Sequence, residues 1–264
     1  MIDEQAVRER IAEVVDPELD QSVSALGFVD GVEIEGTEVT VRLRLPTYWC
    51  AANFAYMMAA GLRERILLVE GVERVTVRVE DHFAESELSA GVSAGRSFFE
   101  IFPGDADGEL EELRRSFTRK AFLIRQEQLL RALLRAGFAP ATLARITAAD
   151  VAVEGTELAV RDGEDGEWRR VNGLAQTWRL WLTKRAALGL ASPGADPLFS
   201  TPEGEPLPPD GVLDHLRSSR MIRLNGAFNT LLCTGLNRVR HGVDVDADAM
   251  WVTPEDPEQE VRPA

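Results

Sequence analysis

Apolar residues in the first part of the chain change from helical to strand-like spacing. In residues 5–15 they recur every three or four positions, which is typical of one face of a helix. Pro17 ends this pattern, because the residue before a proline is disfavoured in the α region. Apolar and polar residues then alternate through 32–34 and 39–45, and a Gly-Thr pair lies between these segments. The pattern therefore predicts a helix followed by a β-hairpin.

Helical spacing returns in residues 50–68, and an alternating segment with three valines follows at 75–79. The resulting order, α-β-β-α-β, suits a small α+β domain whose helices pack on one face of a sheet. We assign this domain to residues 1–84.

The later part of the chain has mainly helical spacing. A long helix is predicted over 109–136, a second over 173–188, and two further helices over 210–219 and 225–239. Between the first two, residues 151–171 have the pattern of a small β-hairpin. The predicted fold class is therefore α+β, in which the first domain is followed by a second, mainly α-helical domain with a small β-hairpin.

Composition separates these parts of the chain. Residues 85–108 contain many serines and glycines, and we interpret them as a linker. The second domain then covers residues 109–242. Residues 243–264 are acidic and contain prolines and few apolar residues, so we predict a solvated, disordered tail.

The chain is strongly acidic. Its formal net charge is −15, of which −8 lies in residues 1–84, whereas residues 109–190 carry +3. A negative field repels polyphosphates, so we do not expect nucleic acid as a partner. The chain has no apolar run long enough to cross a bilayer, and its first residues are amphipathic rather than apolar. We therefore expect a cytoplasmic protein that does not associate with membranes.

Candidate metal ligands are few. The chain has two cysteines, Cys50 and Cys233, and three histidines. This set excludes a disulfide scaffold and a self-contained four-cysteine zinc or iron–sulfur site. The motifs of phosphate-binding loops, dinucleotide-binding turns, serine hydrolases and zinc proteases are absent from the sequence. We therefore predict that the protein is not an enzyme and binds no cofactor stably; a transient or intersubunit metal site stays open.

Cys50 lies where the second predicted strand leads into the second predicted helix. Unpaired N–H groups and the helix dipole at such a position favour a thiolate, which can bind a soft metal ion. Thr47 is placed to cap this helix. The alternative is that Cys50 is a small buried core residue, which is also our interpretation of Cys233. For His82, after the third strand, we expect a surface position, with metal ligation beside Cys50 as the alternative.

Several short motifs occur in a fixed order in the first domain. They are Asp16-Pro17-Glu18, Leu26-Gly27 before Val32-Glu33-Ile34, Thr47 with Cys50, and a closing valine-rich strand after Gly71-Val72. In this order, residues 7–80 resemble the iron–sulfur cluster assembly domain of the SufT-like and PaaD-like proteins. The resemblance implies that Cys50 is the functional thiol and that Asp16 and Glu18 support it.

Two departures from the family pattern lie beside Cys50. Ala51 follows the cysteine where the family often has proline, and Tyr48 and Trp49 precede it where small residues or proline are usual. The site is thus bulkier and more aromatic than in the relatives, which suggests a dedicated client.

The resemblance implies a non-catalytic maturation factor. Such a protein assists assembly or insertion of an iron–sulfur or other iron centre into a client metalloprotein, and some relatives accompany iron-dependent multicomponent oxygenases. One cysteine cannot hold a cluster, which normally needs four protein ligands, so the iron or the cluster would be bound transiently. Either a homodimer that pairs two Cys50 residues or ligands from the client would complete the site.

The second domain has a different resemblance. Residues 129–161, 178–188 and 197–207 resemble the catalytic domain of tyrosine recombinases in the order of their helices, hairpin and Pro-Leu-Phe loop. The activating arginine of that family would fall at Ala139, and no tyrosine follows Tyr56. One alternative function is therefore a DNA-associated protein with a catalytically dead recombinase-like domain. The other is a metal-independent accessory subunit or scaffold of an oxygenase.

Overall fold

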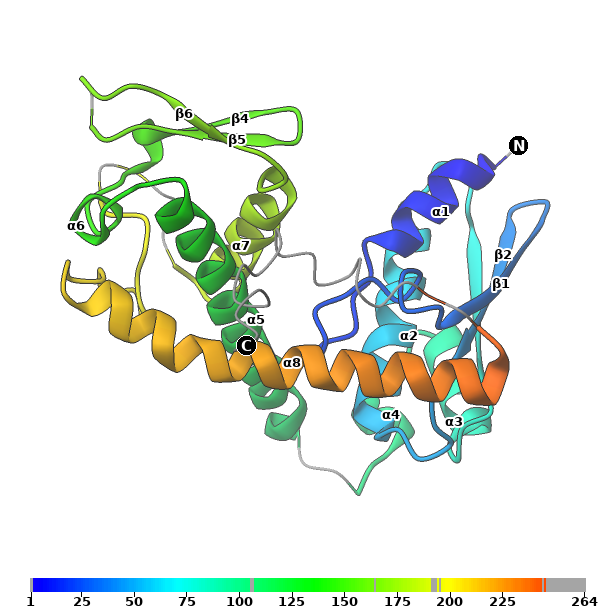
Figure 1. Ribbon diagram of the computed structural model, residues 1–264. Coiled ribbons are helices and arrows are strands. Elements are labelled where there is room, and N and C mark those ends of the chain that lie inside the picture. Colours follow the sequence, from blue (N-terminus) through cyan, green and yellow to red (C-terminus); the bar gives the residue numbers. More distant parts are fainter. Residues whose placement is uncertain are drawn as a thin grey trace, which may run out of the picture. The chain divides into compact units, whose positions relative to one another are not determined.

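The computed structural model of the protein describes residues 2–104, 107–163, 165–190, 194, 196–243 and 245 (Figure 1). The predicted acidic tail lies outside the described residues, except for Val243 and Val245. The chain forms two compact units. Unit 1 contains the residues up to Arg114 and the stretch that begins at Ala227, and unit 2 contains Arg115–Gly226.

Unit 1 begins with the predicted α-β-β-α-β order. Its first elements are α1 (Glu4–Ala12), β1 (Val29–Glu35), β2 (Glu38–Arg44), α2 (Ala52–Ile66) and β3 (Arg74–Glu80). Strand β2 lies between the other two, antiparallel to β1 and parallel to β3. The predicted hairpin turns at Gly36, whose φ of 63° suits glycine.

The core of unit 1 follows from the strand periodicity. Alternate residues of β2 and β3 are buried, because successive side chains of a strand point to opposite faces. The buried valines of these strands share one hydrophobic cluster with apolar residues of α1 and α2, among them Ile11, Met58 and Leu62. The predicted α+β fold class is confirmed.

The stretch that composition assigned to a linker instead forms α3 (Glu85–Ser93) and α4 (Phe98–Ile101). The serines have a structural task, because β3 is an edge strand with unpaired backbone groups. Ser89 Oγ accepts the N–H of Val79 at 2.9 Å, and Ser93 Oγ accepts the N–H of Val77 at 3.0 Å. Gly91, between the two serines, leaves room for Ile101, which would collide with a Cβ at this position.

Unit 2 is mainly helical. It contains most of α5 (Asp107–Arg135), then α6 (Pro140–Leu143), a 3₁₀ turn (Ala148–Asp150), β4 (Val151–Glu154), β5 (Glu157–Val160), β6 (Arg169–Val171), α7 (Ala175–Ala187) and the beginning of α8 (Gly211–His241).

The predicted hairpin of unit 2 is a three-stranded antiparallel sheet. Its extra turn falls at Gly155, which divides the expected first strand into β4 and β5 and has a φ of 61°. Trp181 is at the centre of the core and lies 5.9 Å from Phe122 and 5.6 Å from Phe199 between ring centroids. None of the helices in the described ranges has both the length and the apolar content needed to cross a membrane.

Helix α8 corrects the prediction of two helices over 210–219 and 225–239. The chain is one helix from Gly211 to His241, because a glycine such as Gly226 costs a helix only about 1 kcal/mol and no proline interrupts it. Its residues up to Gly226 belong to unit 2, and those from Ala227 onward belong to unit 1. A segment that we predicted as part of the second domain therefore packs with the first.

Candidate functional site

Cys50 is half-buried in the loop between β2 and α2. Ala51 is the N-cap of α2 and makes no side-chain capping bond, so Cys50 stands one residue before the cap. Thr47, which we expected to cap the helix, contacts the thiol instead, with Oγ1 at 3.3 Å from Cys50 Sγ. A hydroxyl at this distance can donate a hydrogen bond to a thiolate and hold the sulfur in one orientation.

His82 fixes the backbone of this loop. Its Nδ1 accepts the N–H of Ala84 at 3.1 Å, so the ring proton is on Nε2, which donates to the Cys50 carbonyl at 2.7 Å. The side chain is buried, and burial lowers the pKa of His82, which favours the neutral ring. The expected surface position is therefore wrong. In this arrangement both ring nitrogens are used by the backbone rather than offered to a metal ion.

The Asp-Pro-Glu turn is organised by its own carboxylate. Asp16 Oδ1 accepts the N–H groups of Glu18 and Leu19 at 2.9 and 2.8 Å. Asp16 is buried, and its burial raises its pKa from 3.8 to about 6, against the lowering effect of these two bonds. The charges of Glu18 and Asp20 raise the pKa of Asp16 further. The turn therefore holds a buried acid that is partly protonated near pH 6.

The unit 1 part of α8 docks on this turn with one face. Asn229 Nδ2 donates to Glu18 Oε1 at 3.1 Å. Two helical turns later, Asn237 Nδ2 donates to the carbonyls of Leu26 and Gly27 at 3.2 and 3.0 Å. Gly27 has a φ of 69°, and a Cβ there would collide with the chain just after α8. The Leu26-Gly27 motif is thus part of the surface on which α8 packs.

Cys233 lies between these two asparagines on the same face of α8, because residues four apart are neighbours along a helix. Both cysteines pack against the core of unit 1. The pKa of Cys233 is raised to about 12, first by burial and then by the charges of Asp16, Cys50 and Glu18. Cys233 therefore lies within electrostatic range of Asp16, Glu18 and Cys50, which come from two other segments of unit 1.

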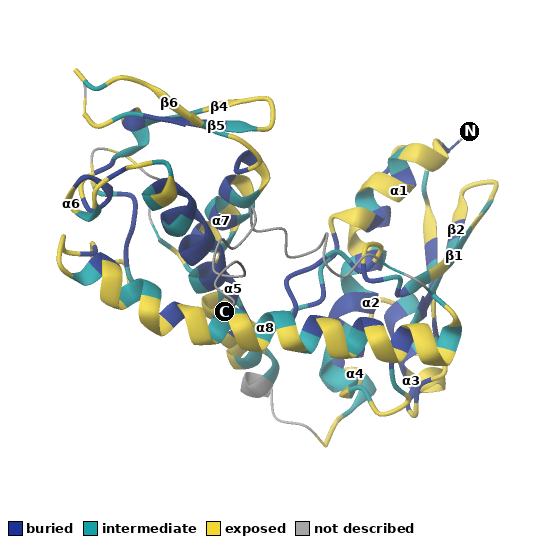
Figure 2. Ribbon diagram, in the orientation of Figure 1, coloured by how far each residue is buried: buried dark blue, intermediate teal, exposed yellow. Residues whose placement is uncertain are grey.

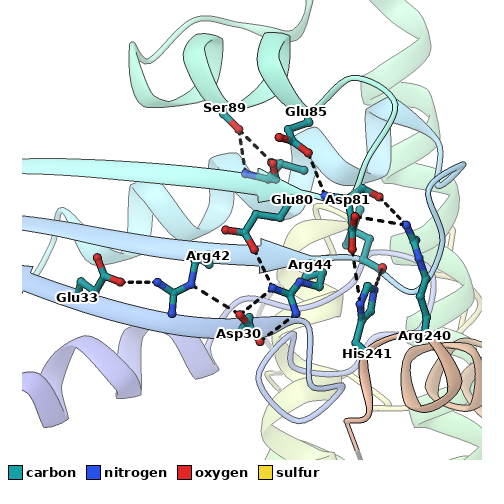
Figure 3. Close-up of polar contacts among 12 residues, drawn as sticks. Asp30, Glu33, Arg42, Arg44, Glu80, Asp81, Glu85, Ser89, Arg240 and His241 are labelled. Carbon is teal, nitrogen blue, oxygen red and sulfur yellow. Dashed lines mark hydrogen bonds and ion pairs between the residues drawn. The ribbon is translucent and has the colours of Figure 1, made fainter.

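The end of α8 is anchored beyond the asparagines (Figure 3). Arg240 donates to the backbone carbonyl of Asp81 at 3.1 Å, and His241 Nε2 donates to the carbonyl of Leu45 at 3.1 Å. Asp81 directly precedes His82, which holds the Cys50 loop. Nearby, Arg44 joins the three strands of the sheet through Asp30 on β1 and Glu80 on β3 (Figure 3).

Three aromatic side chains next to Cys50 are exposed. The rings of Tyr48 and Trp49 meet edge to face at 4.9 Å, and Trp49 stacks on Phe83 at 6.0 Å between centroids. Trp49 is 77% exposed. We call these three residues the aromatic patch. Exposed neighbouring aromatics of this kind are typical of surfaces that contact another protein.

The structure brings Thr47 into contact with Cys50, and Asp16 into contact with Glu18, as two separate pairs of predicted residues. The prediction of Cys233 as a core residue of the second domain is wrong in its place, because the side chain packs against the core of unit 1. The available signal was the recurrence of Asn229, Cys233, Asn237 and His241 every four residues along one helix. Within the described ranges, no group of three or more histidine, cysteine, aspartate or glutamate side chains is close enough to hold a metal ion by itself.

Residues 4–79 match the family model described as iron–sulfur cluster assembly protein. The resemblance predicted over 7–80 is therefore confirmed, and this stretch is a domain of that assembly family. The match supports a role in iron–sulfur cluster assembly. It includes Cys50 but not Cys233. Neither the comparison with curated proteins nor the comparison with solved structures gives a match.

Proposed function

We propose that the protein is a non-catalytic maturation factor that helps to assemble or insert an iron–sulfur or other iron centre in a client protein. The observation that carries this proposal is the Cys50 thiol within the matched domain. It is half-buried, it is contacted by Thr47, and its backbone is clamped by the buried His82. Such a thiol is accessible to a small cation yet fixed in position.

Each neighbouring group has a task in this proposal. Thr47 orients the sulfur, and His82 keeps the loop at the start of α2 in place. Asp16 and Glu18 add negative charge that attracts a cation toward the thiol. Iron or the cluster is the cargo of this site rather than its resident cofactor. The remaining ligands would come from the client, since a cluster normally needs four.

We further propose that the client docks on the aromatic patch. Trp49 is the residue immediately before Cys50. A client bound at the aromatic patch would therefore present its own ligands to the thiol. Partly exposed aromatic side chains contribute disproportionately to protein interfaces. By the resemblance of the first domain, we propose an iron-dependent multicomponent oxygenase as the client.

The test is client maturation with the wild type, Cys50→Ala and Cys50→Ser. Iron and sulfide are measured in the purified client after co-expression, together with client activity. We expect both variants to lose most of the iron delivered, because both lack the thiol while serine keeps the size and a polar contact with Thr47. Equal iron content in clients matured by the wild type and both variants would refute the proposal. Full client activity with Cys50→Ser would instead favour a metal-independent scaffold.

A further inference from the structure

Helix α8 exposes its large apolar side chains and buries polar ones. Thr230 and Asn237, which lie two turns apart on one side of the helix, are buried (Figure 2). The opposite side carries a row of exposed apolar residues, which we call the α8 stripe: Leu213, Met221, Leu224, Phe228, Leu231, Leu232, Leu236 and Val239. The largest apolar patch on a typical monomer covers about 300–600 Å² and is often functional. A stripe along a whole helix therefore indicates a binding surface.

We propose that the α8 stripe is a homodimer interface, in which the α8 helices of two copies of the chain pack antiparallel. The stripe is a property of α8 alone, because one continuous helix from Gly211 to His241 fixes which side chains share a side. This inference goes beyond the proposed function and does not involve the thiol of Cys50.

The spacing of the stripe is that of a two-helix seam. Met221, Leu224, Phe228 and Leu231 follow one another at intervals of three, four and three residues, as core positions of paired helices do. A two-fold axis at Gly226 exchanges residues that are equally far from it along the helix. Met221 then lies opposite Leu231 of the second copy, and Leu224 lies opposite Phe228 of the second copy. All four core positions are thus matched with apolar residues.

The charges at the two ends of the stripe favour a second copy of this chain. The same spacing leads to Asp214 near the start of α8 and to Arg238 near its end, and both side chains are exposed. In the antiparallel arrangement, Asp214 of each copy lies opposite Arg238 of the other. Parallel helices would instead place Asp214 beside Asp214 and Arg238 beside Arg238, and like charges at an interface are unfavourable. The Asp214 side chain is 76% exposed although it pairs with Arg217 at 2.7 Å, so it can take a second partner.

Gly235 is a further sign of a close approach from outside the chain. Glycine is the least favourable residue after proline inside a helix, yet Gly235 lies within α8 and is exposed. Its φ is not positive, and a Cβ there would have no described atom within 4 Å. Neither the backbone nor packing within the described residues therefore requires glycine. In the proposed dimer, Gly235 lies opposite Arg217 of the second copy, where the missing side chain makes room for a long one.

The apolar area is also of the right order. The exposed fractions of the eight side chains range from 39% to 88%. Two stripes of this size, buried together with their flanking charges, approach the area of about 1,200–2,000 Å² that a specific interface covers.

The first experiment measures the mass of the full-length protein by sedimentation equilibrium. We expect twice the mass of one chain for the wild type at micromolar concentration and the mass of one chain for Leu231→Arg. Because Leu231 is exposed in the single chain, the arginine disturbs no core. Leu68→Arg, at an exposed apolar residue outside α8, is the matched control and should remain dimeric.

Three outcomes of this experiment would overturn the inference. The first is a wild type that stays monomeric up to its highest soluble concentration, and the second is a Leu231→Arg variant that is still dimeric. The third is a dimer that Cys50→Ala abolishes, since this would indicate pairing through Cys50. A monomeric wild type that loses client binding in Leu231→Arg would assign the stripe to the client instead.

The second experiment tests the antiparallel register by charge exchange. Asp214→Arg and Arg238→Asp should each raise the dissociation constant of the dimer at least about tenfold, because each places like charges opposite one another twice. The variant that carries both changes should return to the wild-type value. Net charge alone predicts the reverse for Asp214→Arg, which makes an acidic chain less negative. Single variants that dimerise as well as the wild type, or a double variant that is not restored, would overturn the inference.

Discussion

The two cysteines of this protein are held in different ways. Cys50 is placed by its neighbours in the sequence, through Thr47 three residues earlier and the start of α2 just after it. Cys233 is placed by contacts with residues that are about 210 positions away, through Asn229 and Asn237. The first arrangement belongs to a motif that a family model can detect. The second exists only once α8 has docked, so a comparison of sequences over the first domain cannot include it.

The largest expected effect is at Asp16, whose charge acts on Cys233. Its pKa is raised from 3.8 to about 6 by burial, so the folded protein binds this proton more tightly than the unfolded chain. Stability from Asp16 is therefore present below about pH 4 and is lost as the pH rises toward 6. The charges of Glu18 and Asp20 also oppose ionisation of Asp16.

Asp16→Asn should therefore stabilise unit 1 by up to about 3 kcal/mol above pH 7 and have little effect at pH 4. Asparagine can still accept the N–H groups of Glu18 and Leu19. Hydrogen exchange of the buried β2 amides at several pH values measures the difference. Glu87→Gln, which removes an exposed charge on α3, is the control and should change little. Unchanged stability of the variant at pH 8 would mean that burial of this carboxylate does not lower the free energy of unfolding.

Removal of the two asparagines should affect Cys233 more than Cys50. Asn229→Ala with Asn237→Ala deletes three hydrogen bonds, which weakens the docking of α8 by about 2 kcal/mol. Local opening that exposes Cys233 should then be about 30-fold more frequent, and alkylation of Cys233 correspondingly faster. Cys50, held by its own loop, should change far less.

Asn225→Ala is the matched control for this pair, since Asn225 is an exposed asparagine in the same helix. Rates are read by mass spectrometry of the two cysteine peptides. If the double variant leaves the rate at Cys233 unchanged, the asparagines do not hold this part of α8 in place.

The aromatic patch distinguishes the two cysteines, because in the sequence it adjoins Cys50 and not Cys233. Trp49→Ala should weaken client binding about tenfold, because exposed aromatic side chains contribute most to such interfaces. Titration calorimetry with the apo client measures this effect. Leu68→Ala, another exposed apolar residue of unit 1, should bind the client normally. Unchanged client affinity in Trp49→Ala would contradict the assignment of the client to the aromatic patch.

The smallest expected effect is at Thr47, whose hydroxyl contacts Cys50 and not Cys233. Thr47→Val should lower the affinity of the protein for Co²⁺, a thiophilic probe ion, a few-fold, which corresponds to about 1 kcal/mol for one hydrogen bond. In the Cys50→Ser background the same change should have almost no further effect, whereas in the Cys233→Ser background it should persist. Thr40→Val on β2 serves as the control. Equal effects in the two backgrounds would contradict the assignment of Thr47 to Cys50.

Much of unit 1 was predictable from its sequence because its elements are strongly periodic. The hairpin, the helix after Cys50 and the third strand all appear where the apolar pattern places them. The α3 segment was missed because serine and glycine are also the residues of flexible linkers. Ser89 and Ser93 are instead required by an edge strand, which becomes apparent only when the strand order is known.

Around Cys50, features set by residues close together in the sequence could be predicted, whereas contacts between distant residues could not. The sequence by itself determined the strands, the helix start at Cys50 and the Asp-Pro-Glu turn, because short-range sterics and periodicity dictate them. It also determined the family resemblance, which depends on motifs in a fixed order. Only the tertiary structure decided that His82 is buried against Cys50 and that one helix carries Cys233 onto the core of unit 1. A helical pattern specifies which residues share a face, but not which distant surface that face will meet.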